Sequence, residues 1–221
     1  DVDDSGTAAD LVRALSGLWS YWISEGDFER CQVVSRQLIA QLDRAGAGGR
    51  VATVQSIRGT EAFWTGRLVE ARTALLQAAE LYDDDRFRST EWGLAHDLLV
   101  AVQALLGPLL VIMGDEAAGL TTLESGVVRA ASLDGPTGPF SEAYVRAYLA
   151  WVRRMRGDVE EAAREADLVV DIGERRGFAE WMLVGAMHQA AALQAAGDHE
   201  RACDELASSL RAFRSLGGGT G

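Results

Sequence analysis

The stretch RGDVEEA at residues 156–162 decides the fold, because close variants of it recur along the chain. The others read EGDFERC (25–31), TGRLVEA (65–71), MGDEAAG (113–119) and AGDHERA (196–202). In every copy a Gly is followed by a polar residue, which is Asp in four of the five. Gly takes the left-handed conformation that ends one helix, and Asp can cap the start of the next. Each copy therefore predicts a tight turn between two antiparallel helices.

The turns recur at the interval of a helical repeat. Their spacings are 40, 48, 43 and 40 residues, measured between Gly26, Gly66, Gly114, Gly157 and Gly197. Between the turns apolar residues follow helical spacing, and nowhere is the alternation of a strand sustained. We expect ten helices, at 6–25, 27–44, 48–65, 67–82, 89–113, 115–133, 139–156, 158–176, 178–196 and 198–215.

The predicted fold is all-α, a right-handed superhelical solenoid of about five hairpins. The hairpins are expected at about 6–44, 48–82, 89–133, 139–176 and 178–215. They form a single domain over residues 1–216, and 217–221 form a flexible tail.

Charge and composition exclude several functions. Among 221 residues, 33 are acidic and 21 basic, so the net charge is −12 and a nucleic-acid partner is not expected. All 21 basic residues are Arg, which removes every mechanism that needs a lysine. Since no GxxxxGK[ST] motif is present either, we expect the chain not to bind ATP.

Location is predicted from three features. Residues 98–114 carry no charge, but Gly107-Pro108 interrupts them, so we expect a buried central helix and no membrane contact. Cys31 and Cys203 fit no metal spacing and are expected to be buried free thiols in a reducing compartment. No signal peptide is visible in the acidic first ten residues. We therefore expect a cytoplasmic protein.

The turns resemble the tetratricopeptide repeat, whose first helix carries a Gly and whose second helix continues to a small Ala. The second hairpin matches best, with Gly59, Gly66, Ala71 and Ala78. Departures are the longer repeats, the missing terminal Pro, and Cys31 in place of an Ala. The resemblance implies a divergent tetratricopeptide-like family.

The whole chain also resembles the helical-repeat region of bacterial multidomain ATPase regulators, namely LuxR-type large ATP-binding activators and cyclase-ATPase proteins. The stretches that carry this resemblance are RALSGLWSYWISEGDFERC, FWTGRLVEARTALLQAAELYD, GPFSEAYVRAYLAWVRRMRGD and ERRGFAEWMLVGAMHQAAALQAAGD. It implies a sensor or scaffold arm in transcription regulation or signal transduction, beside an adjacent ATPase domain. It implies no nucleotide binding by these residues.

A binding groove is expected on the concave side, lined by the first helix of each hairpin. The resemblance to tetratricopeptide repeats implies that the groove residues include Phe63, Trp64, Tyr144, Trp151, Arg154, Met155 and Met187. The aromatics of the fourth hairpin interleave with Arg146, Arg153, Arg154 and Arg156, which would attract a protein partner or a small anionic ligand. The alternative is that the aromatics form core and the arginines pair with Asp158, Glu160 and Glu161.

No catalytic residue, cofactor site or metal site is predicted. Asp83, Asp84 and Asp85 lack the further carboxylate that a diphosphate site needs. His96, His188 and His199 form neither an HExxH helix nor a ligand cluster.

These features leave three candidate functions. The first is a non-catalytic sensor or scaffold module that binds a ligand or protein inside a regulator. The second is a stand-alone interaction scaffold, and the third an all-helical enzyme, which the spacing of polar residues disfavours.

The first helix adds an expectation about association. It is expected to expose Leu11, Leu15, Leu18, Trp19 and Trp22 and thereby to dock on a preceding domain or to form a homodimer.

Overall fold

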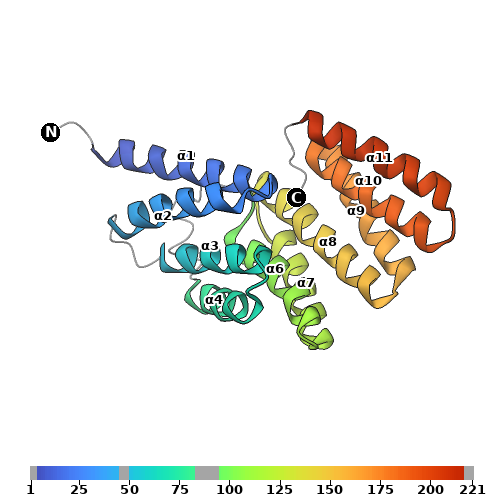
Figure 1. Ribbon diagram of the computed structural model, residues 1–221, viewed down its shortest axis with the longest axis horizontal. Coiled ribbons are helices and arrows are strands. Elements are labelled where there is room, and N and C mark those ends of the chain that lie inside the picture. The colour runs from blue at the N-terminus through green and yellow to red at the C-terminus, as the bar shows by residue number, and fades with distance from the viewer. Residues whose placement is uncertain (1–3, 45–49, 83–94, 217–221) are drawn as a thin grey trace. The chain divides into compact units, whose positions relative to one another are not determined.

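The computed structural model describes residues 4–44, 50–82 and 95–216, which contain ten α-helices and no strand (Figure 1). The chain forms two compact units. In the first lie α1 (Asp4–Ser24), α2 (Phe28–Arg44), α3 (Arg50–Trp64) and α4 (Leu68–Leu81). In the second lie α6 (Leu98–Ile112), α7 (Glu116–Ala131), α8 (Thr137–Arg156), α9 (Val159–Arg176), α10 (Ala179–Ala195) and α11 (His199–Ser215). The all-helical prediction is confirmed, and the single domain over 1–216 stays a prediction.

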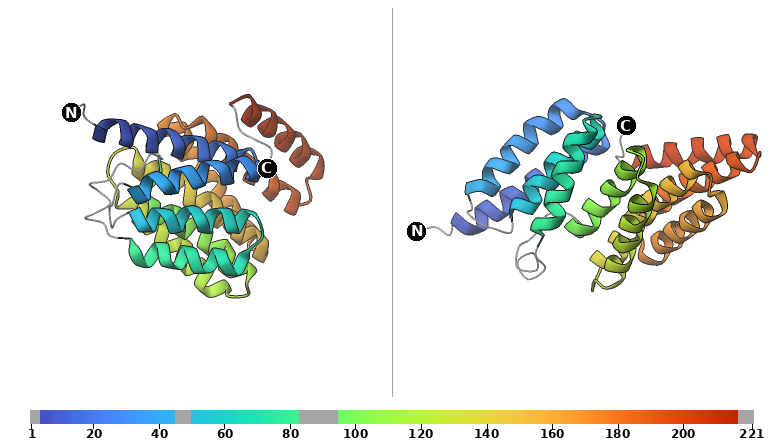
Figure 2. Two further views of the ribbon diagram at one scale, coloured as in Figure 1. Left: turned by 60° about the vertical axis from the view of Figure 1, so that its left-hand side comes forward. Right: turned by 90° about the horizontal axis from the view of Figure 1, so that it is seen from below.

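Successive helices pair into antiparallel hairpins, as the ribbons of α3 with α4 and of α10 with α11 show (Figure 2). The predicted turns are confirmed, because all five of their glycines have a positive φ: Gly26, Gly66, Gly114, Gly157 and Gly197. At each turn the amide that follows the Gly donates to a carbonyl five residues earlier, as from Asp158 to Arg153 over 2.9 Å. This is the Schellman arrangement, which satisfies carbonyls that the helix end leaves open.

Within hairpins, glycines let the two helices approach closely. A Cβ on Gly59 would stand 2.7 Å from Leu75 Cγ, and one on Gly107 would stand 2.3 Å from Leu123 Cγ. Both pairs are separated by 16 residues in the sequence, so the second and third hairpins close in the same way. In these two hairpins the glycine of the first helix is therefore a packing requirement.

In the second unit the first helix of a hairpin packs on both helices of the hairpin before it. Thus α8 contacts α6 and α7, and α10 contacts α8 and α9. Leu123 of α7 is fully buried together with Val145 and Val152 of α8, which ties the two hairpins into one core. Helix α8 therefore packs on helices of both other hairpins and lies in the middle of this unit.

The predicted central helix is buried as expected but begins later than predicted. A continuous helix from 89 is wrong at Ala95–Asp97, which are not helical, and residues 83–94 lie outside the described range, as does the loop predicted there. Asp97 caps α6 by accepting from the Val100 amide at 3.0 Å, while its own amide donates to Ser141 Oγ at 2.8 Å. Among the described helices, none is long and apolar enough to cross a membrane. The expected tail at 217–221 is likewise outside the description.

Three expectations about exposure need correction. Cys203 is exposed rather than buried, whereas Cys31 is buried as predicted and donates to Glu61 Oε1 at 3.5 Å. Leu15 and Trp19 of α1 are buried, at 9% and 6% exposure, because this side of the helix packs on the core of the first unit. Trp19 Nε1 also donates to Glu61 at 3.3 Å.

Candidate functional site: an aromatic row ending in an arginine

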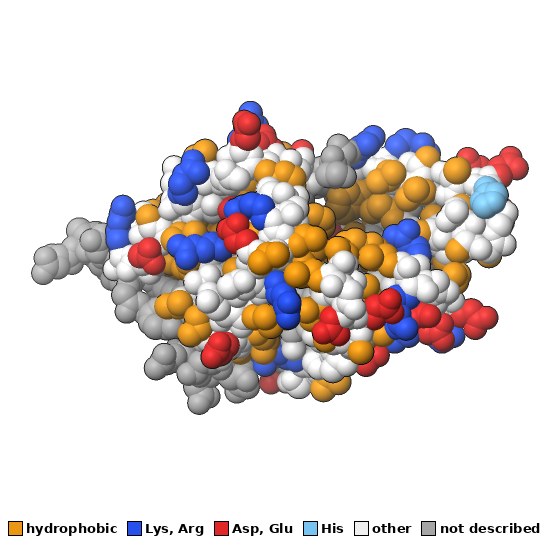
Figure 3. Space-filling model, turned by 60° about the horizontal axis from the view of Figure 1, so that its bottom comes forward, with side chains coloured by type: hydrophobic (Ala, Val, Ile, Leu, Met, Phe, Trp, Pro, Cys, Tyr) orange, Lys and Arg blue, Asp and Glu red, His pale blue; other side chains and the backbone are white. Residues whose placement is uncertain are grey.

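The candidate site is a row of aromatic side chains along α8. Phe140, Tyr144, Tyr148 and Trp151 are spaced by three or four residues, so they follow one face of the helix. The ring centroids of Tyr144 and Tyr148 are 5.2 Å apart, and those of Tyr148 and Trp151 are 6.1 Å apart. All four residues are half-buried, and the space-filling view shows hydrophobic side chains around a hollow on this unit (Figure 3).

Neighbouring elements hold the row in place. Trp181 of α10 meets Phe140 and Tyr144 edge to face, with centroids 5.4 and 5.6 Å away. His96, just before α6, stacks on Tyr144 at 4.8 Å. Burial lowers the pKa of His96 to about 4 despite the opposing charge of Asp97, so this imidazole is neutral near pH 7. Burial also raises the pKa of both tyrosines, which keeps the row uncharged.

One buried donor in the row has no acceptor. Trp181 is only 5% exposed, and its indole Nε1 finds no hydrogen-bond partner in the structure. A buried N–H without an acceptor costs about 1–3 kcal/mol. The packing of its ring in the core cluster, with Phe140 and Tyr144 among its neighbours, offsets that cost.

Three of the four arginines in this region are neutralised by carboxylates. Arg146 contacts Glu142 and Glu165 at 2.8 and 2.7 Å. Arg153 lies 3.6 Å from Glu124 of α7. Arg156 lies 3.2 Å from Glu116 and 3.5 Å from Asp158. Of the partners expected from the sequence only Asp158 is used, because Glu142 lies on α8 itself and Glu165, Glu124 and Glu116 reach the arginines from neighbouring helices.

The fourth arginine ends the aromatic row. Arg154 is exposed and forms no ion pair with any described residue. The positive charge of Arg154 acts on His188 of α10. Burial of His188 and this charge together lower the pKa of the imidazole to about 4. A positive guanidinium beside a neutral imidazole can accept a carboxylate or another anion. Exposed Met155 adds an apolar surface next to it.

The predicted groove residues fall in different places. Tyr144, Trp151, Arg154 and Met155 lie on α8, and half-buried Met187 lies on the adjacent α10. Trp64 is in the first unit and is 40% exposed. Phe63 is 7% exposed and so belongs to the interior of the first unit, which corrects its assignment to an accessible groove.

Sequence reasoning missed four members of the site, Phe140, Trp181, His96 and His188. Phe140 lies on α8 itself, one turn before Tyr144, whereas Trp181, His96 and His188 reach α8 only through tertiary packing. The aromatic spacing on α8 was the one local signal available.

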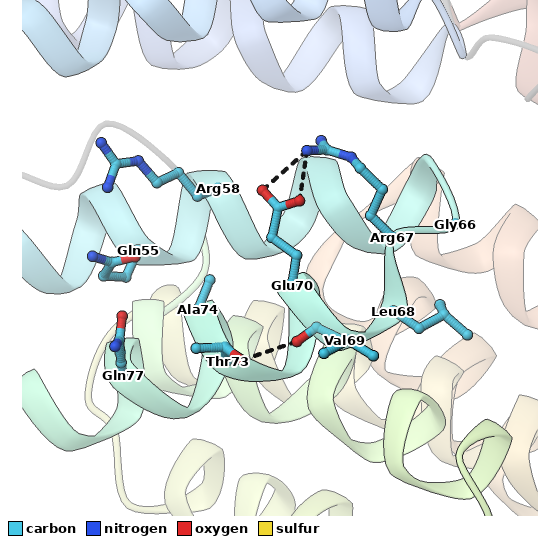
Figure 4. A pocket seen from close by; sticks show the side chains of 10 residues that line it. All are labelled: Gln55, Arg58, Gly66, Arg67, Leu68, Val69, Glu70, Thr73, Ala74 and Gln77. Atoms are coloured by element: carbon cyan, nitrogen blue, oxygen red, sulfur yellow. Dashed lines mark hydrogen bonds and ion pairs between the residues drawn. The ribbon is translucent and has the colours of Figure 1, made fainter.

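The second hairpin of the first unit carries a different depression, of about 730 Å³, between α3 and α4 (Figure 4). Its polar lining comes from Gln55, Arg58 and Gln77, and Arg67 closes one end by binding both oxygens of Glu70 at 2.8 and 3.0 Å. None of the predicted groove residues lines it. In the described ranges no group of three His, Cys, Asp or Glu side chains could hold a metal ion.

Comparison with known proteins places the fold but no family. No family model matches the chain, and no curated protein matches its sequence. The structure is similar to BtubC (BKLC) from P. vanneervenii, with a TM-score of 0.62 and 18% identity over 99% of this chain and 85% of that one. It is also similar to a putative kinesin light chain of Podosopora anserina with nearly identical TPR-like repeats. There the TM-score is 0.55 and the identity 20%, over 95% of this chain and 97% of that one. The chain thus has the fold of a tetratricopeptide-like repeat solenoid.

Proposed function

We propose that the chain is a non-catalytic protein-interaction scaffold that binds a segment of a partner protein along the α8 aromatic row. The observation that carries the proposal is the row of half-buried aromatic residues from Phe140 to Trp151, ended by the exposed Arg154. Repeat solenoids bind partners on the surfaces that stacked hairpins leave open. Aromatic and arginine side chains supply most of the binding energy in protein interfaces.

The charges of the chain indicate the chemistry of the partner. At a net charge of −12 the chain repels anionic groups, so the unpaired Arg154 is a local favourable approach for a carboxylate. The rings beside it offer a large apolar area with few rotatable bonds. A partner segment with an apolar side chain and a nearby carboxylate fits both features, and a small anionic ligand fits only the second.

A finer assignment is an effector-sensing arm of a LuxR-type regulator, with an adjacent ATPase domain as partner. It rests on the sequence resemblance alone, since neither similar structure is described as a regulator or an ATPase. The fold likeness favours the scaffold. Sequencing the gene on both sides of the codons for residues 1–221 tests the regulator assignment, because that assignment requires an ATPase domain encoded before or after them.

Site-specific photocrosslinking tests the scaffold in the native cell type. A benzophenone amino acid at Met155, at the end of the row, should give a discrete covalent adduct with one or few polypeptides. The matched control is the same amino acid at Leu168, which is 39% exposed on α9. Arg154→Glu combined with the Met155 probe should remove the adduct. Equal adducts at both positions, or none at Met155, would contradict the proposal.

A further inference from the structure

A second row of side chains runs on α10, beside the aromatic row of α8. The turn glycines Gly157 and Gly197 are 40 residues apart, so position 140 of α8 corresponds to position 180 of α10. Helices α8 and α10 contact each other, and Val184 packs in one cluster with Tyr144. The two rows therefore form the two sides of one surface. The α10 row consists of Glu180, Val184, His188 and Ala191.

The α10 row begins with an exposed carboxylate. Glu180 lies in the first turn of α10 and forms no ion pair with any residue that the structure describes. It directly precedes Trp181, whose ring meets Tyr144 edge to face at 5.6 Å. Burial is the main cause of the raised pKa of Tyr144, and the negative charge of Glu180 adds to it. The carboxylate is therefore close enough to act on the phenol of the α8 row.

The two ends of this surface carry opposite charges. At the far end Arg154 is exposed, and its charge acts on His188 of α10. Ten residues separate Tyr144, beside Glu180, from Arg154, which is about 15 Å along the helix axis. Between these ends the two rows carry side chains that are uncharged near pH 7, namely Tyr148, Trp151, Val184, His188 and Ala191.

We infer that the surface binds an extended partner segment whose cationic side chain contacts Glu180 and whose carboxylate contacts Arg154. The inference rests on the proposed function, since it uses the same α8 row, and it adds the positions of the charges on the partner. An extended chain advances about 3.3 Å per residue, so these two charges stand about four or five residues apart. An aromatic or aliphatic side chain between them lies against the rings.

Glu180 also excludes partners of the wrong charge. At a net charge of −12 the chain attracts cations over much of its surface, and Glu180 fixes where on this surface the cation binds. A purely acidic segment would satisfy Arg154 but would place a second carboxylate beside Glu180. Repulsion there disfavours that segment, so Glu180 is a residue that determines specificity.

Photocrosslinking from Met155 separates this inference from the proposed function. With the benzophenone amino acid at Met155, Glu180→Arg should reduce the adduct to about a fifth. Glu160→Arg is the matched control, because Glu160 is likewise exposed in the first turn of a helix of this unit, and it should leave the adduct unchanged. An adduct that survives Glu180→Arg, or an equal loss in Glu160→Arg, refutes the inference alone. No adduct in the otherwise unchanged chain refutes the proposed function as well.

Two synthetic peptides test the charge positions with ligands of known sequence. Both are labelled with fluorescein and flanked by Gly-Ser; one contains Lys-Ala-Phe-Ala-Asp, and the other has Asp in place of the Lys. Fluorescence anisotropy should show that the unchanged chain binds the first about fivefold more tightly, and that Glu180→Arg reverses the preference. Equal binding of both peptides, binding of neither up to ~1 mM, or a preference that Glu180→Arg leaves in place overturns the inference.

Discussion

At the scale of single residues, glycine has two separate roles in this chain. The turn glycines adopt positive φ, as Gly157 does at 84°, and end a helix there. The helical glycines instead make room for a neighbour, as Gly107 does for Leu123. The two roles predict different responses to substitution, because strain arises from the backbone in one case and from packing in the other.

Gly107→Ala should lower the free energy of unfolding by about 1–3 kcal/mol, because its Cβ would stand 2.3 Å from Leu123 Cγ. Gly17→Ala is the matched control and should raise it by about 0.5–1 kcal/mol, since the added methyl meets nothing and favours the helix. Urea unfolding at a concentration where the chain is monomeric measures both. Equal effects of the two variants would show that packing at Gly107 is not tight.

His188 should make stability depend on pH. Burial and Arg154 lower its pKa from 6.5 to about 4, so between these values the unfolded chain binds a proton that the folded chain does not. Stability attributable to His188 is present above pH 6.5 and falls as the pH falls, by about 2 kcal/mol at pH 5. In His188→Gln the free energy of unfolding, measured by urea titration, should fall by about 2 kcal/mol less between pH 7.5 and 5 than in the unchanged chain.

The exposed His199→Gln is the control for this measurement and should keep the full loss. Part of the pH dependence should also survive in His188→Gln, because burial lowers the pKa of His96 in the same direction. An unchanged pH profile in His188→Gln would mean that this imidazole is solvated.

At the scale of elements, one carboxylate fixes the start of α6. Asp97 accepts from the Val100 amide and binds Arg129 through both oxygens, at 2.7 and 3.0 Å. Both side chains are largely buried, with exposures of 11% and 15%. Asp97 thereby joins the start of α6 to the end of α7, and Ser141 ties both to α8.

Asp97→Ala should lower the free energy of unfolding by about 3 kcal/mol, because it removes a cap and one side of a buried ion pair. Asp97→Asn keeps the capping oxygen and should cost less. Asp115→Ala removes only an exposed cap on α7 and should cost about 1 kcal/mol. Thermal unfolding of the three variants ranks them, and an Asp97→Ala no worse than Asp115→Ala contradicts the role of the ion pair.

The elements were predictable from the sequence to the extent that their signals are local. The five predicted turn glycines follow from a Gly and its polar successor read along the chain, whereas Gly135 and Gly177 also have positive φ without such a successor. The sequence predicts too early a start for α6, since Asp97 acts through Arg129 and Ser141, which are 32 and 44 residues away. The site was predictable along α8 only. Trp181 and His188 join it through the packing of α10, which has no periodic sequence signal.

At the scale of the whole molecule, stability should be local to each unit. Repeat hairpins contact only their neighbours, so a defect affects mainly the hairpins around it. Leu105→Ala in α6, a 2% exposed position, should cost about 2–5 kcal/mol and accelerate amide exchange in α6 to α9. Exchange in α3 and α4 should change much less.

Ile57→Ala in α3, a fully buried position, provides the reciprocal variant. It should accelerate exchange in α1 to α4 and leave α10 and α11 unchanged, as measured by mass spectrometry of exchanged peptides. If either variant accelerated exchange evenly along all described helices, the chain would unfold as one cooperative body.

The shared offset between helical glycine and leucine also bears on how such a gene can change in length. Gly59 with Leu75 and Gly107 with Leu123 close two hairpins by the same contact. Recombination between two equivalent turn codons would therefore add or remove one complete hairpin and keep the phase of the flanking helices. The surviving ends would meet through contacts that the chain already uses, so the length of the array can evolve separately from the side chains that recognise a partner.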